Sequence, residues 1–445
     1  MAMLPRLRPR CFYDLVIEVA IVRPGPIQGG MVHPYLRRRQ GLEPVSYPSP
    51  EVESVLQRTL GVPIFQEQVM QLAIVAAGFS PGEADHLRRS MAAWKRRGGV
   101  AHLRERLING MLARNYTREF AEALFRQIEG FGDYGFPESH AASFALLVYV
   151  SAWLKHHAPA AFLAGLLNSQ PMGFYSASQL VQDARRHGIA VRPPDVLHSD
   201  WETTLEDRSA VRLGLRQISG LGSDAGRRIA AARSAARFAG FADLADLARR
   251  AALTRDDLDQ LAAAGALASL AGHRRQAAWA AAAVPLQRDL LHEATPCESA
   301  IALPSPSEGE DLVADYASLQ LTLGRHPLSL LRALLETRRY LTTATLRTYA
   351  DNRVARCAGI VTGRQRPGTA SGVVFLTLED ETGLANVIVH PKLAEGQRRE
   401  LLSARLLGVF GVVQRAGEVV HLIAKRLVDH SDLLGQLMTS SRDFH

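Results

Sequence analysis

Apolar residues recur at a helical spacing over the first part of the chain. From residue 1 to about residue 205 they return every three or four positions, between connectors rich in glycine and proline. This period predicts a mainly helical region. Ser80 is followed by Pro81 and, three positions after Ser80, by Glu83, which is the pattern of a capping box with proline in the first helical position. A helix is therefore expected to begin at residue 81.

A second helical region, rich in alanine and arginine, runs from Arg208 to about Leu291. Within it, Gly220 and Gly222 separate an apolar segment from a basic one. A helix, a Gly-x-Gly turn and a basic helix are typical of a helix-hairpin-helix, in which glycine lets backbone N–H groups approach a DNA phosphate. Gly222 is expected to need a positive φ, and residues 253–267 look like a degenerate second copy. The alternative is an ordinary turn between two helices.

The pattern changes to that of a β-sheet towards the end of the chain. Residues 292–311 are rich in proline, serine and glutamate and mark a domain boundary, and residues 312–350 are predicted to be helical. Five segments with the pattern of strands follow, with a helix expected near 391–402 between the third and the fourth. The five segments are residues 356–363, 372–381, 385–390, 405–414 and 419–427. Five strands with a helix in that place predict an OB fold.

Composition and charge indicate a polyanionic partner. The chain of 445 residues is long enough for about two to four domains, and its formal charge is +8 with an isoelectric point near 9.7. All but four of its 52 basic residues are arginines. The planar forks of arginine suit phosphate oxygens, although a GC-rich genome would give the same bias.

The remaining compositional features concern location and chemistry. The three cysteines are far apart and form neither a metal-ligand spacing nor a disulfide framework, which predicts a reducing compartment. No apolar run reaches about 20 residues, the length that spans a bilayer, and no secretory signal is found, so a cytoplasmic protein without a membrane partner is expected. Nothing in the sequence resembles a Ser/His/Asp triad, a P-loop or a zinc site.

A candidate phosphate site lies at the start of a helix near residue 140. Residues 130–136, rich in glycine and aromatic residues, run into Pro137 and then Ser139, which is a good N-cap. His140 would then lie in the first turn, where unpaired N–H groups and the helix dipole favour an anion such as phosphate. Most capped helices bind nothing, so the other clusters decide the interpretation.

Two polar clusters upstream are candidates for holding a nucleotide. Arg23 stands before a Pro-Gly-Pro break that stiffens its backbone, and its alternative role is to cap the preceding element. Phe65 begins an apolar-periodic helix, and its ring could stack on a base or sugar while Gln66 or Gln68 donates to a phosphate. The alternative places Phe65 in the core and the glutamines in solvent.

The strongest basic set consists of Arg88, Arg89 and Lys95, because helical spacing brings at least two of them onto one face. The alternative is that both arginines pair with Asp85. One carboxylate is not expected to satisfy both arginines and the lysine as well. Contact with a triphosphate or with the template backbone is therefore favoured.

Basic residues in the two C-terminal regions are candidates for DNA contact. Arg227 and Arg228 add charge beside the Gly-x-Gly turn without reading sequence. Arg364, Arg366 and Phe375 lie near the first strands of the predicted OB fold and form a candidate groove for a single strand. Aromatic residues are few there, so stacking on bases would be limited.

Taken in order, these motifs resemble the fingers region of bacterial C-family DNA polymerases, of the polymerase III alpha type. Residues 92–99, 137–147 and 166–175 are most similar to the error-prone, damage-inducible branch. The resemblance implies a multidomain, mainly α chain with a C-terminal OB-type β-barrel. Its expected parts are a polymerase fingers region at 1–205, a tandem helix-hairpin-helix at 206–290, a linker and helical connector at 291–350, an OB-fold domain at 351–430 and a tail at 431–445.

The same resemblance implies a polymerase without its metal site. In this family the metal-binding aspartates lie in a palm domain that precedes the segment matching Cys11–Asp14, and no Asp-x-Asp precedes Arg23 here. The expectation is the C-terminal part of the enzyme, with a native terminus at residues 440–445. Mg²⁺ would serve the complete enzyme in a two-metal mechanism. This chain would hold no catalytic residue and bind no cofactor.

The resemblance also implies roles for particular residues. Those implied to bind the nucleotide are Arg23, Phe65, Gln66, Arg88, Arg89, Lys95 and His140. Those implied to bind DNA are Gly220, Gly222, Arg227, Arg228, Arg364 and Arg366. Two positions depart from the family pattern. Phe65 stands where tyrosine is common, and Ala92 to Lys95 replace a lysine cluster, which matches the error-prone branch.

The expected function is that of the C-terminal part of an error-prone DNA-directed DNA polymerase in damage tolerance and damage-induced mutagenesis. It would bind primer-template DNA and deoxynucleoside triphosphates, work with the accessory mutagenesis proteins of that branch, and be inactive alone. Two alternatives remain open: a non-catalytic DNA-binding module acting through the hairpin and OB parts, and a remnant of a truncated polymerase gene. An upstream reading frame with intact palm aspartates would favour a split enzyme.

Overall fold

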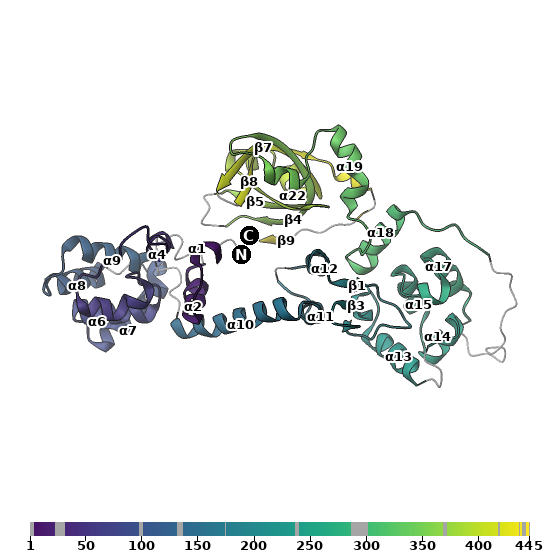
Figure 1. The fold of residues 1–445 in the computed structure, drawn as a ribbon, viewed down its shortest axis with the longest axis horizontal. Coiled ribbons are helices and arrows are strands. Elements are labelled where there is room, and N and C mark those ends of the chain that lie inside the picture. The colour runs from purple at the N-terminus through teal and green to yellow at the C-terminus, as the bar shows by residue number, and fades with distance from the viewer. Residues whose placement is uncertain are drawn as a thin grey trace. The chain divides into compact units, whose positions relative to one another are not determined.

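The computed structural model divides into two compact units, Met1–Trp153 and Leu154–His445 (Figure 1). Each is described here by itself. The residues that the structure describes are 4–22, 32–97, 101–130, 137–173, 175–235, 240–285, 301–367, 372–416, 419–435, 437 and 442–444. The boundaries expected at residues 205, 290 and 350 stay predictions.

The first unit is built of helices around one apolar core. Its helices are α1 (Leu4–Leu7), α2 (Phe12–Ile21), α4 (Val32–Arg39), α5 (Pro50–Leu56), α6 (Gln66–Ala77), α7 (Pro81–Arg97), α8 (Ala101–Leu112), α9 (Arg118–Gly130) and the first part of α10 (Glu138–His157). The core gathers the buried faces of α2, α6 and α8. The predicted capping box is confirmed, because Ser80 N–H donates to Glu83 Oε2 at 2.7 Å and Glu83 N–H donates to Ser80 Oγ at 3.3 Å.

Helix α10 begins at Glu138, and the N–H of Ala141 donates to the carbonyl of Pro137 at 3.1 Å. Ser139 therefore lies inside the first turn, and the expectation that it is the N-cap is wrong. Only Ala141 and Ala145 are fully buried along α10. Its other apolar side chains, including Leu147 and Trp153, are about half exposed.

The second unit opens with helices and a small sheet. Helices α11 (Pro159–Asn168) and α12 (Ala177–Arg186) precede strands β1 (Ala190–Arg192), β2 (Thr204–Leu205) and β3 (Ala210–Arg212). The strand order is β1-β3-β2, with β1 parallel and β2 antiparallel to β3. This sheet is not predicted from the sequence, because strands of two or three residues are too short to show an alternating pattern.

The region of the predicted hairpins is helical. After the short 3₁₀ turn η3 (Leu215–Gln217), its helices are α13 (Ser223–Ser234), α14 (Leu244–Arg250), α15 (Arg255–Ala263), α16 (Ala268–Ala271) and α17 (Arg274–Ala283). Their buried faces share one core with α11 and β3. The expected irregular connector falls partly outside the described residues. Residues 301–307 are irregular, and α18 (Glu308–Leu319) begins where Ser307 caps it, earlier than expected.

Two more helices, α19 (Pro327–Thr337) and α20 (Thr343–Thr348), lead to a closed β-barrel. Its strands are β4 (Val354–Gln365), β5 (Val374–Asp380), β6 (Gly383–Val389), β7 (Leu406–Ala416) and β8 (Val419–Asp429). The order is β5-β6-β8-β7-β4, and pairing of β4 with β5 closes the barrel. Strands β6 and β8 are parallel, and α21 (Pro391–Gly396) and α22 (Arg398–Ser403) lie between β6 and β7 in sequence. The predicted OB-type barrel is confirmed.

Two features join the barrel to its neighbours in sequence. The carboxylate of Asp380, at the end of β5, accepts hydrogen bonds from the N–H and the hydroxyl of Thr343 at 2.7 and 2.8 Å, which fastens α20 to the barrel. The expected tail contributes the turn η4 (Ser431–Leu434) and strand β9 (Arg442–Phe444), which runs parallel to β4. Among the described helices, none has the length and apolar character needed to cross a membrane.

Candidate nucleic-acid interface

The described residues cover most, but not all, of the positions predicted to bind a nucleotide. Arg23 lies outside the described residues. Lys95 belongs to α7, but its side chain is also outside the described part of the structure. Roles for these two residues therefore stay predictions.

Phe65 and Gln68 are occupied inside the first unit. The Phe65 side chain is fully buried at the start of α6, so it presents no face to a base. The amide oxygen of Gln68 accepts hydrogen bonds from the N–H groups of Ile64 and Phe65 at 2.9 and 3.2 Å. Its NH₂ group donates to the hydroxyl of Thr59 at 2.9 Å. The structure thus places Phe65 in the core, the alternative to stacking, and leaves Gln66 partly exposed.

The start of α10 is surrounded by carboxylates of the same unit. Glu67 of α6 accepts the hydrogen bond of the Glu138 N–H at 2.9 Å. Glu138 in turn accepts from the hydroxyl of Tyr13 at 2.7 Å and lies 3.5 Å from Arg58. Burial and this bond to Glu138 raise the pKa of Tyr13. A phosphate beside the exposed His140 would therefore meet negative charge at the same helix end.

The two arginines of α7 share a single carboxylate. Arg88 donates to Asp85 Oδ1 at 2.8 and 3.0 Å, and Arg89 donates through Nε to Asp85 Oδ2 at 2.8 Å. The alternative in which both arginines pair with Asp85 is therefore what the structure shows, because each oxygen takes one guanidinium. The expectation that one carboxylate does not satisfy both arginines and Lys95 as well stays a prediction, since the Lys95 side chain is outside the described residues. Hydrogen bonds from Arg89 and Arg88 hold the pKa of Asp85 below its ordinary value. The side chains of Arg88 and Arg89 are 40% and 71% exposed, so these ion pairs are weak and exchangeable.

The first hairpin turn has an open face. Gly220 has φ +85°, and a Cβ added there would lie 3.0 Å from the Gln260 side chain. Gly222 has φ −73° and caps α13, and an added Cβ would meet nothing within 4 Å. The need for a positive φ thus lies at Gly220, and the expectation for Gly222 is wrong. The exposed N-terminal turn of α13 is accessible to a backbone phosphate.

Arg227 and Arg228 are adjacent but differ in surroundings. Arg228 donates to the carbonyls of Ala251 and Ala252 at 2.8 and 3.2 Å and so fastens α13 to the end of α14. Arg227 is exposed, and within the described part of the chain it makes no hydrogen bond or ion pair. Of the two predicted phosphate contacts, Arg227 is the available one.

The two arginines predicted in the barrel differ in the same way: one is bonded to backbone carbonyls and the other is exposed. Arg364 is 8% exposed and donates to the carbonyls of Leu401 and Ala404 at 2.7 and 2.5 Å, which satisfies the end of α22. Its predicted contact with DNA would require these bonds to break. Arg366 is exposed and lines a hollow of about 330 Å³ together with Arg398. Arg366 therefore remains accessible to a phosphate.

The outer face of the barrel places Phe375, predicted from the sequence, beside residues that were not predicted. Phe375 pairs with Ile388 and Thr377 pairs with Asn386 across β5 and β6, and Asn386 pairs with His421 of β8. This strand face is where OB folds bind oligonucleotides. Among the described residues, the buried Nδ1 of His421 has no hydrogen-bond partner. The alternation along β5 was a usable signal, because it separates Phe375 and Thr377 from the inward-facing residues.

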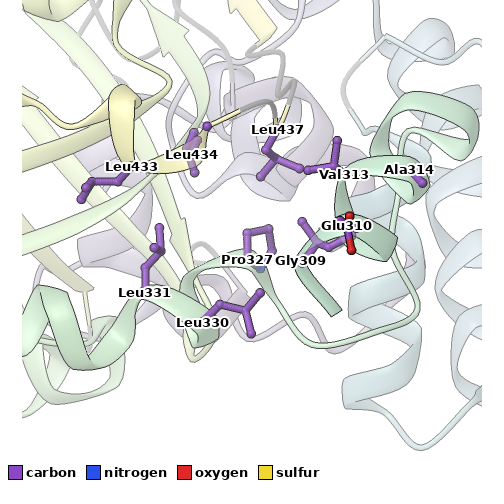
Figure 2. Close-up of a pocket in the computed structure, with 12 residues that line it drawn as sticks. Gly309, Glu310, Val313, Ala314, Pro327, Leu330, Leu331, Leu433, Leu434 and Leu437 are labelled. Atoms are coloured by element: carbon purple, nitrogen blue, oxygen red, sulfur yellow. The ribbon is translucent and has the colours of Figure 1, made fainter. Parts of the chain in front are cut away.

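A second hollow, of about 510 Å³, has a different character (Figure 2). It lies between α18, α19 and η4, and its walls are almost entirely apolar, with Leu331, Leu434 and Leu437 among them. Glu310 is its charged residue. Because it offers no cation, it is unsuited to DNA phosphates.

The described residues also bear on the Mg²⁺ expected of the complete enzyme. Within that part of the chain, no group of three or more His, Cys, Asp or Glu side chains could hold a metal ion. The residues described therefore do not fit a polymerase metal centre.

Comparison with known families agrees with this architecture. Residues 1–115 match the bacterial DNA polymerase III alpha subunit finger domain. Residues 188–277 match a helix-hairpin-helix motif, and residues 355–429 match an OB-fold nucleic acid binding domain. The chain is thus similar, in this order, to a polymerase III alpha finger domain, a helix-hairpin-helix motif and an OB-fold domain.

Individual relatives narrow the group. The error-prone DNA polymerases of Dechloromonas aromatica and Bordetella bronchiseptica are each 64% identical to the chain, over its whole length and 43% of their own. That of Pseudomonas aeruginosa is 60% identical over the same shares. The chain is thus similar over its whole length to error-prone DNA polymerases, and it spans less than half the length of these relatives.

Proposed function

We propose that this chain holds DNA and the incoming nucleotide as the C-terminal part of an error-prone DNA-directed DNA polymerase. The whole enzyme would act in damage tolerance and damage-induced mutagenesis, in the cytoplasm, with accessory mutagenesis proteins. The observation that supports this best is the identity of 64% along the full chain to error-prone DNA polymerases. The hairpin and OB matches support DNA binding, and the finger match is the reason for proposing nucleotide binding in the first unit.

The hairpin and the barrel would supply the DNA contacts. The open turn at Gly220, the N-terminus of α13 and the exposed Arg227 offer phosphate contacts without base-reading side chains. Arg366 and the outer face of β5 and β6 would hold a single strand. Binding of this kind is indifferent to sequence and weakens with salt.

The fingers unit would hold the deoxynucleoside triphosphate. A triphosphate carries more charge than the single carboxylate of Asp85, so it can take Arg88 and Arg89 from their exposed ion pairs. Gln66, His140, Arg23 and Lys95 remain proposed contributors. Arg88→Ala should weaken triphosphate binding by about 1.5–3 kcal/mol, measured by titration calorimetry. Equal affinity in the two proteins would contradict the assignment.

Catalysis would need the part of the relatives that this chain does not span. The proposed division is tested by primer extension with the purified 445-residue chain, Mg²⁺ and deoxynucleotides, beside a full-length relative as positive control. We expect the relative to extend the primer and the chain to bind it without extension. Template-dependent extension by the chain alone would refute the proposal.

A second candidate function is a DNA-binding module without a nucleotide site. It is favoured by the contrast between Arg227, which is available, and Arg88 and Arg89, which are paired with Asp85. DNA binding together with no detectable triphosphate binding, in the chain and in a chain supplied with the rest of the enzyme, would select this function.

A further inference from the structure

A cavity of about 610 Å³ lies inside the second unit, where α11 and α12 meet the turn between β5 and β6. Lys155 and His156, at the end of α10, lie at its edge, and Glu379 and Leu384 reach it from the barrel. The volume falls in the range of small-ligand sites, about 300–1,000 Å³. Residues 1–115, which match the finger domain, and residues 188–277, which match the helix-hairpin-helix motif, do not line it.

The walls of this cavity suit a planar ring. Phe162, Leu163 and Leu180 of α11 and α12 form apolar walls. Tyr175 also lines the cavity and is 57% exposed. An exposed tyrosine beside an apolar floor offers the stacking surface that single-strand binding proteins use for unpaired bases.

Cations lie at the same edge. Lys155 Nζ is 2.8 Å from Asp183 Oδ2, and both side chains are 40% exposed or more, so this pair is exchangeable. Arg186 lines the cavity, is exposed, and makes no hydrogen bond or ion pair within the described residues. Its charge partly offsets the rise that burial causes in the pKa of Glu379. Lys155 and Arg186 together provide two positive charges and N–H donors for the oxygens of one phosphate group.

The outer face of the barrel leads to this cavity. Along β5 and β6 the pairs Phe375–Ile388 and Thr377–Asn386 are followed on the same face by Glu379–Leu384. The last pair lines the cavity. Successive pairs on one face are separated by two residues, about 6.6 Å. A strand of DNA that follows this face therefore reaches the cavity edge.

We propose that this cavity takes one unstacked nucleotide of single-stranded DNA, with its base against Tyr175 and its phosphate held by Arg186 and Lys155. The inference rests on the proposed DNA-binding function and adds a site to it. Free mononucleotides share the same chemistry, and the experiment below separates the two sources.

The test uses fluorescence anisotropy of the full chain with labelled oligo(dT) and with a labelled duplex. Tyr175→Ala should weaken oligo(dT) binding about fivefold or more, since one stacked base contributes about 1–3 kcal/mol. Arg186→Ala should weaken it too and make its salt dependence shallower. Duplex binding, which depends on the hairpin, should stay unchanged in both variants.

Two matched variants control for general effects. Tyr149→Ala removes an equally exposed tyrosine of α10, and Arg185→Ala removes the exposed arginine next to Arg186. Both should bind oligo(dT) like the wild type. Unchanged oligo(dT) affinity in Tyr175→Ala and Arg186→Ala, with duplex binding intact, would overturn the cavity proposal alone.

Two further outcomes are equally decisive. If the wild-type chain binds neither the duplex nor oligo(dT), the proposed DNA-binding function is overturned, and the cavity proposal with it. Binding of deoxyadenosine monophosphate that depends on Tyr175, with oligo(dT) affinity independent of Tyr175, would assign the cavity to a free nucleotide and overturn the single-strand assignment.

Discussion

The first unit, called the fingers unit here, and the hairpin region both carry adjacent arginines within a helix, yet the two pairs have different surroundings. Arg88 and Arg89 both donate to Asp85, one to each carboxylate oxygen. In the hairpin, Arg228 donates to two backbone carbonyls while Arg227 stays exposed. The comparison teaches that helical spacing predicts which face a cation occupies, whereas the neighbouring acceptors decide whether that cation is available.

The same contrast extends to the aromatic and cap positions of the fingers. Phe65 matches a family motif but is fully buried. The start of α10 matches a phosphate site but already bonds Glu67. In the hairpin, by contrast, the N-terminal turn of α13 is exposed. Phe65 and the start of α10 thus have partners within their own unit, whereas the N-terminal turn of α13 is open to a ligand.

The largest expected effect concerns Phe65. Phe65→Ala should destabilise the first unit by about 3–5 kcal/mol, because it removes a fully buried ring from the core. Thermal and denaturant unfolding would measure this, with Phe12→Ala, which removes a half-exposed ring, as the mild control. Unchanged stability combined with weaker nucleotide binding would instead put the ring in a binding site.

A second prediction concerns pH in the second unit. His326 caps α19 by accepting from the Leu328 N–H at 3.1 Å, and burial lowers the pKa of His326 to about 4. The folded state therefore disfavours the proton that the unfolded chain binds below about pH 6.5. Stability should be lost as the pH falls from about 6.5 towards 4, by about 2 kcal/mol at pH 5.

His326→Asn keeps a cap acceptor but removes the titrating ring, so its stability should depend less on pH in this window. Burial raises the pKa of Glu379, which titrates with the opposite effect on stability. The difference between wild type and variant, measured by unfolding between pH 7 and pH 4.5, isolates His326. Parallel curves for the two proteins would show that His326 titrates normally.

The barrel could be predicted from the sequence because its strands are long and alternate. Segments of seven residues, such as β5 and β6, carry a period of two that few other structures produce. The sheet of β1 to β3 could not, since its strands have two or three residues. The length of the strands, more than their composition, decided which of the two sheets could be predicted.

The candidate site was predicted less completely, for a different physical reason. Arg227 and Arg228 are one residue apart, and a helical step of about 100° turns the first to solvent and the second to the carbonyls of Ala251 and Ala252. These acceptors lie more than twenty residues away in sequence. The sequence around Arg228 cannot indicate these acceptors, because only tertiary packing brings the two carbonyls next to the Arg228 side chain.

A smaller effect is expected from the carboxylate that pairs with Arg88 and Arg89. Asp85→Asn removes the charge that holds Arg88 and Arg89, so triphosphate affinity should rise about twofold. Titration calorimetry would measure it, with Glu105→Gln on α8 as a control, because this carboxylate forms no ion pair with an arginine among the described residues. A fall in affinity would show that Asp85 positions the arginines rather than competing for them.

The most direct test of the account is the salt dependence of duplex DNA binding in two single variants. Arg227→Ala should lower the slope of log K against log salt by about 0.9 and leave the unfolding temperature unchanged. Arg228→Ala should keep the wild-type slope and unfold at a lower temperature, because two carbonyls of the α14 end lose their donor. A wild-type slope in Arg227→Ala would contradict the claim that this hairpin holds DNA.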